Sequence, residues 1–203
     1  MMNELAYVLS HGDEAVTDAV VRTLERDGWT VVQSSADPYQ AVNGVVYIPG
    51  LLEDNAVAHV DPATALLDLV ESLRSRFPSA TDGGARVAAV GSRDWLGWPS
   101  RPRAAAEAAA LVAMVRSLAL AHGQAGITVN SVIGIPPDAA SRRDAGPAPG
   151  THLLEPVALT GAPVTPDDIA AAVAFFLDRR SGYITGQTLH CCGGASLLSS
   201  LSV

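Results

Sequence analysis

Short apolar runs alternate with segments of helical periodicity along almost the whole chain. Strands that alternate with helices form a parallel sheet covered by helices on both faces. Right-handed crossovers then arrange these units as a doubly wound, Rossmann-like α/β layer. The length of 203 residues suits a single domain, 1–203, with a full hydrophobic core. The predicted strands are 6–10, 29–32, 44–48, 85–90, 127–133 and 187–191, and the predicted helices cover about 16–24, 64–77, 103–122 and 165–177.

The segment from about Arg103 to His122 shows the clearest helical pattern. Its larger apolar residues form one stripe, and its alanines leave a smooth face that can pack closely against a partner helix. The last helix has a strong start signal, with Thr165 as N-cap and proline at the first helical position. In contrast, the polar, Pro/Gly-rich stretch 136–151 predicts a mobile loop.

Composition and charge exclude several classes of function. The net charge of -8 and the pI near 4.9 leave no basic surface for nucleic acid. We expect no membrane span, because no apolar run approaches the required length, and no signal peptide at residues 1–14. The two cysteines, Cys191 and Cys192, are adjacent and cannot link distant segments, so a reduced cytoplasmic protein is expected.

Three segments, in order, resemble conserved stretches of the short-chain dehydrogenase/reductase (SDR) superfamily. RSLALAHGQAGITVNSV at 116–132 is similar to the family's "r-lA-ela--gIrVN-v" stretch, and TPDDIAAAVAFFLD at 165–178 to its "peeiA-av-fL-s" helix. SGYITGQTLHCCGGASL at 181–197 resembles the "yiTGq-l-vDGG" ending. The resemblance implies an SDR-type fold, because these stretches build the scaffold and the subunit contacts.

The cofactor-binding turn departs from the family's pattern. SDR enzymes bind the pyrophosphate with a TGxxxGxG turn, whose glycines let backbone amides approach the phosphates. The matching stretch, residues 10–17, keeps only Gly12 and places Asp13 and Glu14 where phosphates would lie. The family's NNAG becomes YIPG, which keeps only Gly50. The resemblance therefore implies that NAD(P) binding is lost, with Gly12 and Gly50 as vestiges.

The catalytic pair of the family is also missing. Aligning the helix that ends in RSLA places the active-site Tyr and Lys at Ala104 and Ala108, and the chain contains no lysine at all. Neither a phenol to protonate an alkoxide nor an ammonium to lower its pKa is present. The family's Ser corresponds to Ser92, and its relay Asn corresponds to Asp61. The chain is also short between residues 32 and 45, where a strand and a helix that flank the adenine pocket should lie, so we predict a catalytically degenerate SDR.

Each remaining candidate residue has a functional and a structural interpretation. Ser92 binds a substrate carbonyl or caps a turn, and Asp61 acts as an acid or base or caps the helix before Pro62. Trp95, Trp98 and Arg101 cover the family's substrate cleft, where they either stack on a flat ligand or fill the space of the absent cofactor.

Polar residues elsewhere leave similar alternatives open. His11 is a base in a changed pocket or a solvated turn residue. The run His190-Cys191-Cys192 suggests a metal or redox site, but adjacent strand residues point to opposite faces, so we expect no metal site.

Three hypotheses on function follow. The first is a non-catalytic partner of an active SDR dehydrogenase or ketoreductase, in acyl or polyketide metabolism, assembled as a homo- or hetero-oligomer through the 103–122 helix and the C-terminal strand. The second is a nicotinamide-independent dehydratase, isomerase or cyclase that uses Ser92, Asp61, Tyr47 and His11. The third is an ordinary NAD(P)-dependent oxidoreductase whose motifs are misaligned here.

Overall fold

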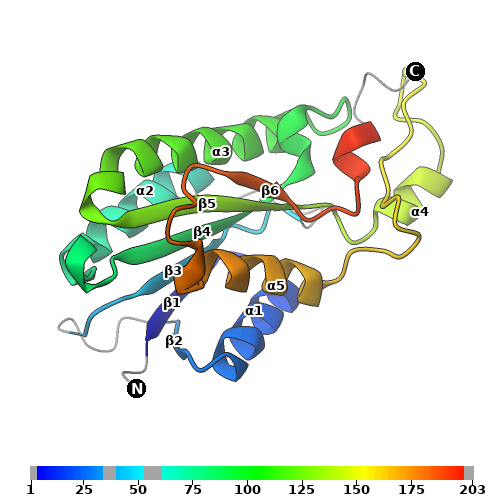
Figure 1. Cartoon of the computed structure of the whole chain (residues 1–203). Coiled ribbons are helices and arrows are strands. Elements are labelled where there is room, and N and C mark those ends of the chain that lie inside the picture. The colour runs from blue at the N-terminus through cyan, green and yellow to red at the C-terminus, as the bar shows by residue number, and fades with distance from the viewer. Residues whose placement is uncertain (1–3, 34–39, 53–60, 199–203) are drawn as a thin grey trace.

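The computed structural model describes residues 4–33, 40–52 and 61–198. They form a six-stranded, all-parallel sheet in the order β2-β1-β3-β4-β5-β6 (Figure 1). The strands are β1 (Leu5–Ser10), β2 (Thr30–Val32), β3 (Gly44–Ile48), β4 (Ala85–Ser92), β5 (Ile127–Gly134) and β6 (Thr188–His190). The helices are α1 (Glu14–Arg26), α2 (Pro62–Leu73), α3 (Pro102–His122), α4 (Ala139–Asp144) and α5 (Pro166–Leu177). The predicted doubly wound α/β fold is confirmed.

Helices cover both faces of the sheet, α2 and α3 on one side and α1 and α5 on the other (Figure 1). Successive strand residues point to opposite faces, so a strand covered on both sides must be apolar throughout. In β3, Val45 and Tyr47 belong to the core under α2 and α3, while Val46 and Ile48 belong to the core against α1 and α5. This explains why GVVYI reads as an unbroken apolar run.

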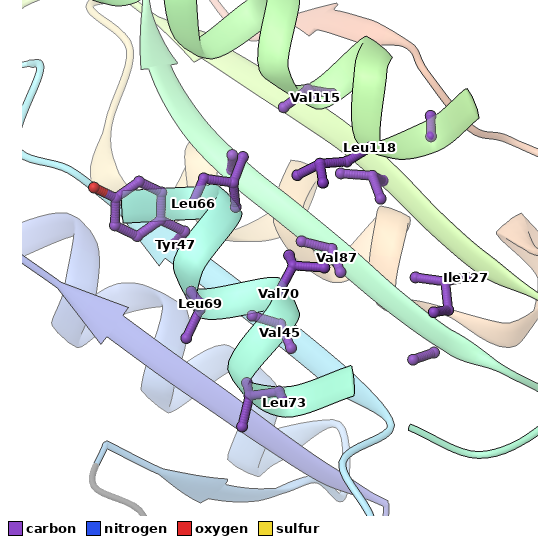
Figure 2. Close-up of a cluster of buried hydrophobic side chains, with 14 of the residues drawn as sticks. Val45, Tyr47, Leu66, Leu69, Val70, Leu73, Val87, Val115, Leu118 and Ile127 are labelled. Atoms are coloured by element: carbon purple, nitrogen blue, oxygen red, sulfur yellow. The ribbon is translucent and has the colours of Figure 1, made fainter. Parts of the chain in front are cut away.

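Figure 2 shows the core under α2 and α3. Leu66, Val70 and Leu73 of α2 are buried against the sheet, together with Val115 and Leu118 of α3. Burying each such side chain contributes roughly 1.5–3 kcal/mol, so this face is a main source of stability.

Two predicted elements differ in detail. The stretch 136–151 contains the short helix α4, so the prediction of an entirely mobile loop was wrong. Alanines and arginines favour helix, and an Arg142–Asp138 ion pair of 2.8 Å spans one turn. The helix predicted at 64–77 begins earlier, because Asp61 accepts a hydrogen bond from the Ala63 N–H, and it ends at Leu73 before a 3-10 turn.

The shortening predicted between residues 32 and 45 affects one edge of the sheet. β2 pairs with β1, and within the described ranges no strand lies beyond it. The chain passes from β2 to β3 within residues 33–43, of which 34–39 are not described. The sheet therefore continues from β1 directly to β3 in the other direction.

One sequence-based expectation on membranes needs correction. The region Pro102–Ala125, which contains α3, is long and apolar enough to cross a membrane by length and composition alone. Its inner face nevertheless forms part of the hydrophobic core, because Leu111, Val115 and Leu118 are buried against the sheet and α2.

Candidate functional site

The turn that joins β1 to α1 is closed by its own acidic residue. Asp13 has left-handed backbone angles and stands at the N-cap of α1, where its side chain does not cap the helix. That side chain is buried, and its Oδ2 accepts a 3.2 Å hydrogen bond from the Leu52 N–H, which follows β3. A carboxylate is favoured at a helix N-terminus, because the first backbone N–H groups of the helix attract negative charge.

The turns after β1 and β3 touch backbone to backbone. A Cβ on Gly12 would lie 3.0 Å from the Cα of Gly50, and His11 N–H donates to the Ile48 carbonyl at 2.8 Å. In open α/β sheets, ligands bind outside the carboxyl ends of the strands at the point where strand order reverses. In this chain that point lies between the neighbouring strands β1 and β3, and the close approach of Gly12 and Gly50 lies at the carboxyl ends of these two strands.

A small cavity remains beside this turn. Its volume is about 80 Å³, whereas sites for small molecules usually have about 300–1,000 Å³. Asp13 and Leu52 line it on one side, and residues of the β5–α4 connection and of the start of α5 line it on the other: Ile135, Pro137, Thr165, Pro166 and Ile169. The cavity is therefore mainly apolar, with a carboxylate at one end.

Tyr47 and His11 lie together at the end of β3 and β1. The Tyr47 hydroxyl is 3.5 Å from His11 Nδ1, at the limit of a hydrogen bond, and the rings meet edge to face. Burial, and then the negative charge of Asp61, raise the pKa of Tyr47 well above its ordinary 10.0. The phenol is therefore neutral at physiological pH, and it is fully buried, while His11 is exposed.

Asp61 and Ser92 make local hydrogen bonds. Asp61 accepts from the Ala63 N–H at 3.1 Å and from the Thr64 hydroxyl at 2.6 Å, and the Thr64 bond is the largest of the contributions that lower its pKa. The buried Ser92 hydroxyl accepts from the Asp94 N–H at 3.2 Å. The structure therefore places these two candidates at the starts of α2 and of a 3-10 turn, rather than around a common reacting group.

The positions that the resemblance assigns to the catalytic pair lie on the first turns of α3. Ala104 is half-buried and Ala108 is fully buried. α3 packs there against the 3-10 turn Arg93–Leu96, which follows β4. Neither methyl side chain can donate a proton or carry a charge.

Arg101 is the centre of a buried ion cluster that sequence reasoning found only in part. Its guanidinium binds both carboxylate oxygens of Asp94, at 2.6 and 2.9 Å, and both of Glu155, at 3.0 and 2.6 Å. The three side chains are 16%, 4% and 7% exposed. Burial lowers the pKa of Arg101, but the hydrogen bonds that it donates to the two carboxylates outweigh this effect and raise that pKa above its ordinary value.

Trp95 and Trp98 follow the carboxyl end of β4, close to Arg93 and Arg101 in the sequence. The guanidinium carbons of Arg93 and Arg101 lie 5.5 and 5.8 Å from the centre of the buried Trp98 ring. Trp95 Nε1–H donates to His190 Nε2 at 3.1 Å, and the two rings stack. Burial, and then the Arg93 charge, lower the pKa of His190, which favours the neutral ring that this bond requires.

The two cysteines that follow His190 are buried to different degrees. Burial raises the pKa of Cys191 to about 11, and Cys192 is buried against Ser196. Within residues 4–33, 40–52 and 61–198, no group of three or more His, Cys, Asp or Glu side chains is placed to hold a metal ion.

A profile of the family described as Enoyl-(Acyl carrier protein) reductase matches residues 53–196, more than half of the chain. Subunit BbsC of (2S)-[(R)-hydroxy(phenyl)methyl]succinyl-CoA dehydrogenase from Thauera aromatica is 32% identical over 193 residues, which cover 93% of this chain and 72% of BbsC. This chain belongs to the short-chain dehydrogenase/reductase superfamily.

A second relative matches a shorter stretch, and a solved structure matches nearly the whole chain. Subunit BbsD of the same Thauera aromatica dehydrogenase is 38% identical over 118 residues, 56% of this chain and 46% of BbsD. The SDR chain thus spans less than half of BbsD. A dehydrogenase/reductase from Sinorhizobium meliloti has the same fold, with a TM-score of 0.71 at 22% identity and 96% of each chain covered.

Proposed function

We propose that this SDR chain is a non-catalytic subunit that assembles with an active SDR dehydrogenase or ketoreductase of acyl metabolism, and that it does not itself bind NAD(P). The observation that carries the proposal is the closed turn, in which the Asp13 carboxylate, bonded to the Leu52 N–H, occupies the N-terminus of α1. A carboxylate in this turn supports the proposed loss of NAD(P) binding, because the SDR pattern binds the pyrophosphate at the turn after the first strand.

Electrostatics and chemistry both support the proposal. Two like charges 4 Å apart repel by about 4 kcal/mol at an effective dielectric constant of about 20, and a pyrophosphate carries two negative charges beside Asp13. In addition, Ala104 and Ala108 replace the proton donor and its cation, and no lysine elsewhere in the chain can take that role. Hydride transfer by this chain alone would lack both the cofactor contact and the acid.

The two Thauera relatives support the role of a partner subunit. BbsC and BbsD are by name two subunits of one dehydrogenase, and this SDR chain is similar to both. A complex that contains two different SDR chains can assign the reaction to one of them. We infer that this chain takes the place of the non-reacting member.

Two exposed apolar surfaces are suited to such an assembly. On α3 the outward positions repeat at intervals of three and four residues and are small up to the exposed Leu120; they are Ala106, Ala110, Ala113, Ser117 and Leu120. Small side chains allow a partner helix to approach closely. The second surface carries Phe175, Tyr183 and Leu189, which are 48%, 105% and 39% exposed beside the edge strand β6.

The test is co-expression of this chain with an SDR that keeps its Tyr–Lys pair and is encoded beside it, followed by co-purification and mass determination. We expect a stable mixed oligomer that Leu120→Glu on α3 dissociates. Leu159→Glu, at a position 56% exposed in the loop before α5, is the matched control and should leave the oligomer intact. If the chains never associate and the partner's kinetics are unchanged, the partner role is wrong.

A second measurement tests the cofactor part of the proposal. Titration of the isolated chain with NADH and NADPH, followed by nicotinamide fluorescence, should show no saturable binding. Saturable binding of NADH or NADPH to the native chain, with no increase in affinity in Asp13→Gly, would contradict the role assigned to the turn.

A further inference from the structure

Arg93 is a buried cation, and two of its nitrogen donors have no hydrogen-bond partner among the described residues. It follows Ser92 at the carboxyl end of β4 and is 2% exposed. Its Nε and Nη1 are buried, and neither has a hydrogen-bond partner among the described residues. An arginine stays charged in proteins, so burial that lowers its pKa does not neutralise it.

The neighbouring carboxylates do not satisfy these donors. Asp94 and Glu155 lie close enough to Arg93 to attract its charge, but Arg101 takes both oxygens of each. Trp98 offers Arg93 a ring face and no acceptor oxygen. A buried charged donor without a partner destabilises the folded state, so we expect an anion or a water molecule to accept its hydrogen bonds.

The surroundings of Arg93 resemble a ligand site in position and in composition. The carboxyl ends of parallel strands are where α/β proteins bind small molecules. Arg93 lies there, and its charge acts on His190 and Cys192, which end and follow β6. Trp95, half-buried and stacked on His190, adds a flat aromatic wall to the same edge.

We propose that Arg93 anchors a binding site for a small aromatic or planar carboxylate at the carboxyl edge of β4 and β6. The carboxylate accepts hydrogen bonds from the unpartnered N–H groups of Arg93, and Trp98 shifts to admit it. A monoanion fits better than a phosphate dianion, because the four side chains Arg93, Asp94, Arg101 and Glu155 are together neutral, and a second negative charge would be repelled by the two carboxylates. This site is separate from the turn at Asp13 and requires no partner subunit.

Sodium benzoate is the probe, and the isolated full-length chain is the sample, at constant ionic strength set with sodium chloride. We expect saturable quenching of tryptophan fluorescence, together with a shift of one arginine Nε–H resonance in the ¹⁵N spectrum. Inorganic phosphate at the same ionic strength should cause neither change. Phosphate binding tighter than benzoate binding would overturn the assignment of ligand class.

Variants assign the site to its residue. Arg93→Gln should weaken benzoate binding about tenfold or more, as expected for the loss of a charged hydrogen bond, and the exposed Arg116→Gln is the matched control that should leave it unchanged. Equal affinity in Arg93→Gln, or no saturable binding in the native chain, overturns the proposal. If Arg93→Gln does not fold, the ¹⁵N spectrum of the native chain is the test. Benzoate binding that shifts no arginine Nε–H signal would overturn the proposal. Because no second subunit is present, the result is independent of the oligomer experiment.

Discussion

A Cβ atom on Gly50 would lie 3.2 Å from the Cα of Gly12, so the turns after β3 and β1 are in direct backbone contact. The contact lies at the carboxyl ends of β1 and β3, between which the strand order reverses, and the Asp13–Leu52 hydrogen bond lies next to it. The conformation of the turn that joins β1 to α1 therefore depends on the Gly12–Gly50 contact and on the Asp13–Leu52 hydrogen bond. The contribution of each to stability can be measured separately.

The first prediction separates contact from backbone strain. Gly50→Ala should destabilise the chain by more than Gly146→Ala, although both glycines have positive φ, +79° and +105°. Only the first added methyl meets other atoms within 4 Å. Gly146→Ala should cost about 1–2 kcal/mol for its backbone conformation alone. Urea denaturation of the two variants gives the comparison. Equal losses in the free energy of unfolding would mean that the added methyl group at Gly50 causes no steric clash between the two turns.

The second prediction concerns the hydrogen bond from Leu52 to Asp13. Asp13→Ala leaves a buried N–H without its acceptor and should cost about 1–3 kcal/mol. Asp13→Asn keeps an acceptor oxygen and tolerates the left-handed backbone, so its loss should be smaller. The free energy of unfolding of both variants decides the matter. If the Asn variant loses as much as the Ala variant, the charge rather than the hydrogen bond stabilises the turn.

The third prediction addresses the buried ion cluster. Arg101→Gln leaves the carboxylates of Asp94 and Glu155 buried without their cation and should destabilise the chain by about 3–5 kcal/mol. Arg22→Gln removes an exposed ion pair of 3.3 Å with Asp167 and should cost about 0–1 kcal/mol. Thermal and urea unfolding measure both, and a loss for Arg101→Gln as small as that for Arg22→Gln would refute a structural role of the cluster.

The fourth prediction is a dependence on pH at the start of α5. The backbone N–H and hydroxyl of Thr165 hydrogen-bond to Asp168 and lower its pKa from the ordinary 3.8. A carboxylate with a lowered folded-state pKa stabilises the fold fully above the unfolded pKa, and loses that effect as pH falls through the folded value. The native chain should therefore exceed Asp168→Asn in stability at pH 7, and the difference should shrink below about pH 4. A difference that is the same at pH 7 and pH 2.5 would contradict the capping interaction.

The fifth prediction concerns thiol reactivity. Cys191, with its pKa raised to about 11 from an ordinary 9.0, should carry about a hundredfold less thiolate at neutral pH than an unperturbed cysteine. Alkylation by iodoacetamide in the folded chain should be correspondingly slow and should accelerate as pH rises, as followed by mass spectrometry. Urea should abolish the protection of Cys191 and of the buried Cys192. Rapid labelling of Cys191 at pH 7 in the folded chain would contradict a protonated, buried thiol at this position.

The fold was predictable where an apolar run or a helix-capping residue marks an element in the sequence. It was less predictable where tertiary packing determines whether an element forms. β3 is buried on both faces, so GVVYI reads as an apolar run, and Asp61 and Thr165 mark helix starts by local chemistry. α4 was missed because its six residues carry no apolar stripe, and glycines and prolines surround it.

The candidate site was predictable only through local signals. Arg101 was singled out beside two tryptophans, and Asp94 is near it in sequence. Glu155, its second partner, comes from a loop 54 residues away, and no local pattern links the two. Arg93 was missed for a related reason: its unused donors become visible only when Arg101 is seen to occupy both carboxylates.

The direct passage from β2 to β3 has a consequence for the history of this chain. Single substitutions can remove Asp13 or restore a glycine in the turn after β1. No substitution, however, can supply polypeptide that is missing between residues 32 and 45, on the side that the SDR pattern assigns to adenine. Under the proposed loss of NAD(P) binding, we expect that point substitutions alone do not create a nucleotide site, and that an insertion at this edge of the sheet is required as well.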